Sequence, residues 1–68
     1  MKEKLLRAVI SHATGHIDKH IANINVYLEN PVGIGEHSDI MEAIESELKQ
    51  IAEYDAQLEV LHKYFHIQ

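Results

Sequence analysis

The stretch ENPVGIGEHSD, residues 29–39, interrupts a sequence that is otherwise patterned as helix. Pro31 cannot continue a helix, and it disfavours helical backbone angles at the preceding Asn30. Gly33 and Gly35 permit backbone angles that other residues avoid. The chain therefore divides into two segments joined by a short turn, and this division decides the fold.

Apolar residues recur on both sides of the turn at spacings of three and four, which is the period of an α-helix. We predict a helix over about 2–29, a turn over about 30–37 and a second helix over about 38–66, with Ser38 as its N-cap. The periodic positions before the turn are Leu6, Ile10, Ala13, Ile17, Ile24 and Tyr27, with His20 in the one polar gap. Those after the turn are Ile40, Ile44, Leu48, Ile51, Tyr54, Leu58, Leu61 and Phe65.

A short connection makes neighbouring helices antiparallel. The predicted fold class is therefore all-α, with a single domain over residues 1–68 that forms an antiparallel two-helix hairpin. If the turn is centred near residue 34, residues that face each other have numbers that add to about 68. This register pairs Ile17 with Ile51 and places Glu47 near His20.

The apolar content exceeds what one hairpin can bury. A chain of 68 residues forms only a marginally stable core, and without cysteine it has no disulfide to brace it. Exposed apolar surface usually marks an interface. We therefore expect self-association into a homodimeric four-helix bundle or a larger helical oligomer. The predicted interface residues are Ile21, Leu28, Met41, Ala52 and Tyr64.

The charge distribution argues against nucleic acid as a partner. The formal net charge is −5, and the basic residues cluster only at Lys2, Lys4 and Arg7, whereas nucleic-acid binding needs a basic face. No apolar run resembles a signal peptide or approaches the roughly 20 residues that cross a bilayer. We expect a soluble cytoplasmic protein that does not bind membranes.

The segment HATGHIDKH, residues 12–20, sets a histidine at every fourth position. Histidines four apart share a helix face, so one metal ion could take His12 with His16 or His16 with His20, with a further ligand from the other helix, Asp55 near His12 or Glu47 near His20. A Glu-x-x-His step, Glu59 and His62, is typical of ferritin-like di-iron bundles. The alternative hypothesis is a metal-binding bundle that uses His16, His20, Glu47, Glu59 and His62.

The simpler interpretation of His20 is a histidine in the apolar stripe. We expect the assembly to loosen in mild acid, between about pH 6.5 and 5, because a proton on His20 would place a charge in an apolar position. The opposing possibility is that Glu47 or Asp55 pairs with the ring, in which case acid would stabilise the assembly until the carboxylates themselves are protonated. No nucleophile has a base and an oxyanion hole beside it. We therefore expect a non-enzymatic interaction or small structural protein that needs no cofactor.

The segments GHIDKHIANINVYLEN and NPVGIGEHSDIMEAIESELKQIAEYDAQLEVLHKYF cover most of the chain. Together they resemble small uncharacterised helical proteins of tailed bacteriophages, including phages of marine bacteria. The resemblance implies a phage origin, with action in the cytoplasm of the infected host cell or a minor role in the virion. It carries over no catalytic or binding residue.

Overall fold

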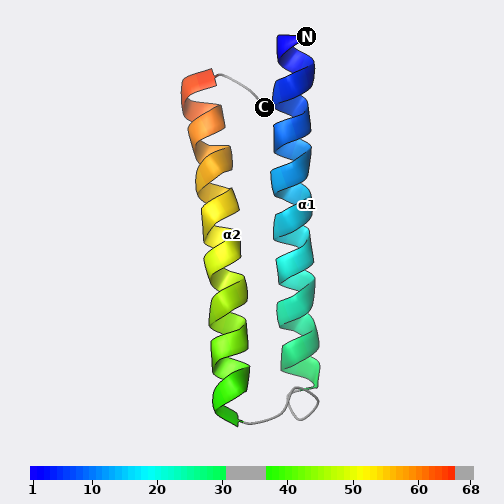
Figure 1. Cartoon of the computed structure of the whole chain (residues 1–68), viewed down its shortest axis with the longest axis vertical. Coiled ribbons are helices and arrows are strands. Elements are labelled where there is room, and N and C mark those ends of the chain that lie inside the picture. The colour runs from blue at the N-terminus through cyan, green and yellow to red at the C-terminus, as the bar shows by residue number, and fades with distance from the viewer. Residues whose placement is uncertain (31–36, 66–68) are drawn as a thin grey trace.

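The computed structural model describes residues 1–30 and 37–65 as two long helices that pack side by side in opposite directions. Helix α1 spans Lys2–Glu29 and helix α2 spans His37–Phe65. Their free ends lie at the same end of a rod that measures 47 × 16 × 13 Å (Figure 1). The predicted all-α antiparallel hairpin is confirmed.

The two ends of α1 and the start of α2 agree with the sequence prediction to within one residue. Helix α1 is closed by backbone hydrogen bonds at both ends, from Leu5 N–H to the Met1 carbonyl and from Asn30 N–H to the Val26 carbonyl, each 3.0 Å long. Helix α1 thus ends before Pro31, as predicted, although Pro31, Gly33 and Gly35 themselves lie outside the described residues. Over the part of the chain that is described, neither helix is long and apolar enough to cross a membrane.

The predicted N-cap of α2 requires a correction. The helix begins at His37, so Ser38 is its second residue and not the residue that precedes it. The backbone at His37 is already helical, and helix limits commonly shift by one residue in this way. At its other end α2 stops at Phe65, and the predicted extension to residue 66 lies outside the described residues.

The seam between the helices is only partly closed to solvent. Among the side chains described, Ala13 alone is fully buried, with an exposed fraction of 0%. The other apolar residues of the seam are half-buried, because one hairpin covers each helix from one side only. They are Leu6, Ile10, Ile17 and Ile24 on α1 and Ile40, Ile44, Ile51, Leu58 and Leu61 on α2.

Side-chain contacts across the seam fix how the helices align. His20 contacts Glu47, and both His12 and His16 contact Tyr54. The numbers of these partners add to between 66 and 70, so the predicted register, with a sum of about 68, is confirmed.

Successive residues of a helix are rotated by about 100° about its axis, so different residues lie on the two sides of the seam. We call one side the polar flank and the opposite side the apolar flank. The polar flank holds His12, His16, Asn23 and Tyr27 of α1 with Glu47 and Tyr54 of α2. The apolar flank holds Ile21 and Leu28 of α1 with Met41, Leu48 and Ala52 of α2.

Replacement of Ala13 by leucine tests the closest part of the seam. Because Ala13 has no exposed surface, three more carbon atoms must push the helices apart, and we expect Ala13→Leu to destabilise the hairpin by about 1–3 kcal/mol. Thermal unfolding followed by circular dichroism at fixed protein concentration measures the change. The matched control is Ala22→Leu on the exposed face of α1, and equal effects at both positions would contradict this account of the seam.

Replacement of Gly15 by alanine should stabilise helix α1. A methyl group added there would meet no atom within 4 Å, and the residue lies well inside α1. Alanine is favoured over glycine in helix interiors, so Gly15→Ala should raise the free energy of unfolding by about 0.5–1 kcal/mol. The reverse change at exposed Ala22, Ala22→Gly, should lower it by a similar amount in the same unfolding experiment.

Candidate functional site

The carboxylate of Glu47 on α2 is the centre of a hydrogen-bonded cluster on the polar flank. Its Oε1 lies 2.6 Å from Nδ1 of His20 and accepts a 3.1 Å hydrogen bond from the Asn23 side-chain amide. Its Oε2 accepts a 3.3 Å bond from the Tyr27 hydroxyl. The side chains of His20 and Glu47 are only 12% and 14% exposed. The predicted pairing of His20 with Glu47 is confirmed.

These bonds determine the protonation of the groups involved. The hydrogen bonds from His20 and Asn23 lower the pKa of Glu47 against an opposing effect of desolvation, so the carboxylate is ionised at neutral pH. An ionised carboxylate only accepts hydrogen bonds, so Nδ1 of His20 must carry the proton. Desolvation raises the pKa of Tyr27, and the negative charge of Glu47 raises it further, so this hydroxyl stays protonated and donates.

A ladder of aromatic rings continues the cluster toward the N-terminus of α1. The ring centroids of His12 and His16 are 4.4 Å apart, and those of His16 and His20 are 6.1 Å apart. Tyr54 of α2 stacks on His16 at 4.7 Å with an angle of 14° between the planes, and it meets His12 edge-on at 6.0 Å. Desolvation lowers the pKa of His16, and the neighbouring His12, Lys19 and His20 lower it further, so its ring is neutral at pH 7.

The five residues of the metal-binding hypothesis do not meet at one site. Glu59 and His62 are exposed, and Glu59 lies twelve residues beyond Glu47 along α2, which corresponds to about 18 Å. His16 and His20 lie on α1 beside Tyr54 and Glu47 instead. Over residues 1–30 and 37–65, no group of three or more histidine, cysteine or acidic side chains is arranged to hold a metal ion.

The Glu47 hydrogen bond also corrects the expectation for acid. Loosening through His20 assumed an unpaired ring in an apolar position, whereas the ring has a carboxylate partner at 2.6 Å. The alternative, in which Glu47 pairs with His20, is the one that the geometry supports. A proton on His20 would therefore meet a negative charge and not an apolar seam.

Sequence reasoning missed the roles of three residues on the polar flank, Asn23, Tyr27 and Tyr54. A signal for two of them is present in the spacing, because His16, His20, Asn23 and Tyr27 follow one another at intervals of four, three and four residues on one helix face. The spacing of Tyr54 predicts an apolar core residue, whereas in the structure its ring contacts the rings of His12 and His16.

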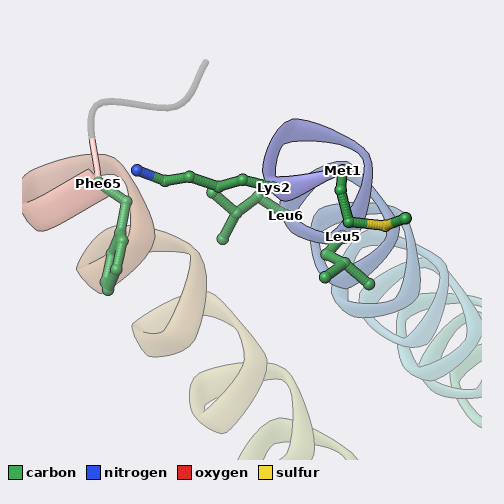
Figure 2. A pocket seen from close by; sticks show the side chains of 5 residues that line it. All are labelled: Met1, Lys2, Leu5, Leu6 and Phe65. Atoms are coloured by element: carbon green, nitrogen blue, oxygen red, sulfur yellow. The ribbon is translucent and has the colours of Figure 1, made fainter.

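Two shallow hollows lie on the surface of the described residues. One lies at the free end of the hairpin, where Lys2 extends from α1 toward Phe65 of α2 with Leu6 beside it (Figure 2). Met1 and Leu5 form its other wall. The second hollow is lined by Val9, Ala56, Gln57, Val60 and Leu61. Both hollows are open and mostly apolar, which suits contact with another apolar surface.

Glu47→Gln tests the cluster. Glutamine cannot carry the charge that strengthens the bonds to His20 and Asn23, and we expect a loss of about 1–2 kcal/mol of stability at neutral pH. Because the folded-state pKa of Glu47 is lowered, its stabilising effect is present above the ordinary glutamate pKa of about 4.3 and is lost as the pH falls through the folded-state value.

Thermal unfolding between neutral and strongly acidic pH measures both effects. The parent should lose more stability in acid than Glu47→Gln does, because the variant has no carboxylate to protonate at this position. Glu45→Gln, an exposed change two residues earlier on α2, is the matched control and should behave as the parent does. Equal acid sensitivity in the parent and Glu47→Gln would contradict the assignment.

Comparison with protein-family models, with curated proteins and with solved structures found no match to this chain. The resemblance to phage proteins therefore stays a prediction, and the function has to be argued from the geometry of the hairpin.

Proposed function

We propose that the protein is a non-enzymatic interaction or small structural protein that self-associates through the apolar flank of its hairpin. The observation that carries the proposal is the exposure of this flank. Ile21, Leu28, Met41 and Leu48 are large apolar side chains that are between 44% and 67% exposed, and Ala52 beside them is exposed as well.

The register makes this flank continuous. Residues that face each other have numbers that add to between 66 and 70, so Leu28 lies level with Met41, and Ile21 lies level with Leu48. The apolar side chains of both helices therefore form one surface on the half of the hairpin nearest the turn. A contiguous apolar surface of this kind is typical of a protein interface.

A second copy of the chain is the partner that fits best. Two such flanks packed face to face would bury apolar surface on both hairpins and form a four-helix bundle, the usual way in which hairpins complete a core. Among the side chains that the structure describes, Ala13 is the one that is fully buried in the seam, so the added core is what a chain of 68 residues lacks.

Four of the five interface residues predicted from the sequence belong to this surface, and the proposal adds Leu48. Tyr64 is exposed but lies near the free end of α2, on the side turned away from the seam, so its role in an interface stays a separate prediction. We further propose that the protein acts in the cytoplasm, that of the infected host cell if the chain is phage-encoded, as the resemblance implies.

Solution molar mass tests the proposal. Sedimentation equilibrium over a range of micromolar concentrations should give a mass of two chains or a larger multiple of 7.8 kDa. The double variant Leu28→Glu/Met41→Glu should shift the mass toward one chain, because association would bury two unpaired charges on each hairpin.

Val26→Glu is the matched control, since Val26 is an exposed apolar residue of α1 that belongs neither to the apolar flank nor to either hollow. It should leave the mass unchanged. A parent that is a stable, folded monomer would overturn the proposal, and so would dissociation by Val26→Glu together with an intact assembly in the double variant.

A further inference from the structure

His12 and His16 lie one helical turn apart on the polar flank of α1, with their ring centroids 4.4 Å apart. His12 is exposed and His16 is half-buried, so the pair can be reached from solvent. We propose that these two histidines form a binding site for a divalent transition-metal ion that prefers imidazole ligands, such as Ni²⁺, Cu²⁺ or Zn²⁺. This inference does not rest on the proposed self-association.

The ring spacing favours this pair over the next one along the helix. Bonds from a metal ion to imidazole nitrogen are about 2.0–2.1 Å long, so two neighbouring imidazole ligands place their centroids about 4.5–5 Å apart. The 4.4 Å separation of His12 and His16 is close to this range, whereas the 6.1 Å separation of His16 and His20 exceeds it.

Tyr54 holds the rings of the pair. It stacks on His16 and meets the edge of His12, so both imidazoles are ordered by an aromatic ring that comes from the other helix. Tyr54 is thus a positioning residue and not a ligand. Because α2 supplies it, the proposed site depends on the packed hairpin as well as on the helical spacing of four.

The number of protein ligands determines how tightly the site binds a metal ion. Since no group of three or more suitable side chains was found among residues 1–30 and 37–65, the protein would supply two ligands and water would fill the other positions. Such an open site binds with modest affinity, in the order Cu²⁺ above Ni²⁺. It lies on the flank opposite the proposed interface and therefore stays accessible in an oligomer.

Isothermal titration calorimetry of the tag-free protein with nickel chloride tests the proposal. We expect one Ni²⁺ per chain, with an affinity that falls by about tenfold or more in His12→Gln and in His16→Gln. His12→Gln is the decisive variant, because His12 is exposed and its replacement should leave the circular dichroism spectrum unchanged. The thermal unfolding midpoint of the parent should rise with added Ni²⁺, since the ion binds only the folded state, and that of His12→Gln should not.

His62→Gln is the control, because His62 is exposed and lies far along α2 from the site, and it should bind Ni²⁺ as the parent does. Tyr54→Phe should keep the affinity and Tyr54→Ala should reduce it; equal affinities in these two variants would remove Tyr54 from the site. The proposal is overturned if the parent binds no Ni²⁺ at millimolar concentration, or if His12→Gln binds as tightly as the parent. It is equally overturned if His62→Gln loses as much affinity as His12→Gln.

Discussion

A half-buried carboxylate between two helices must be hydrogen-bonded, and Glu47 satisfies this requirement with donors from three positions of α1. The alignment of the hairpin depends on these bonds. The apolar stripes of the helices repeat every three or four residues, so a slide by one turn would still place apolar residues opposite one another. Such a slide would separate Glu47 from His20 and Asn23, and an ionised carboxylate without partners is costly to bury. The apolar stripe makes the helices associate, and the Glu47 cluster selects their register.

The same alignment divides the surface of the rod into two chemically different flanks. Glu47 and Tyr54 contact the histidines on one side of the seam. The exposed isoleucine, leucine and methionine side chains of both helices therefore lie on the other side. The apolar surface that could contact a partner and the polar side chains therefore lie on opposite flanks of the rod. A partner can cover the apolar flank while the histidine ladder remains open to ions and protons.

Because the chain is small, a single hairpin has only a small free energy of unfolding. With Ala13 as the one fully buried side chain among those described, most apolar residues of the seam keep part of their surface in water. The free energy that holds one hairpin together is correspondingly small. If a second copy covers the apolar flank, folding and association become linked, and the stability of the protein depends on its concentration.

The sequence by itself determined the secondary structure and the topology. A proline and two glycines between two helical patterns leave one arrangement, the antiparallel hairpin, because the short connection brings the second helix back along the first. It also determined the register closely enough to pair His20 with Glu47, since the distance of each residue from the turn sets its height along the rod. These features follow from local backbone preferences and from counting residues.

Only the tertiary structure decided which side chains meet within that frame. The stacking of Tyr54 on His16, the bonds from Asn23 and Tyr27 to Glu47, and the complete burial of Ala13 depend on how each helix is rotated about its axis. A rotation of a few tens of degrees changes such contacts but leaves the hydrophobic period unaltered. For this reason Tyr54 could be assigned to the apolar stripe from its spacing, while its role beside the histidines required the packed helices.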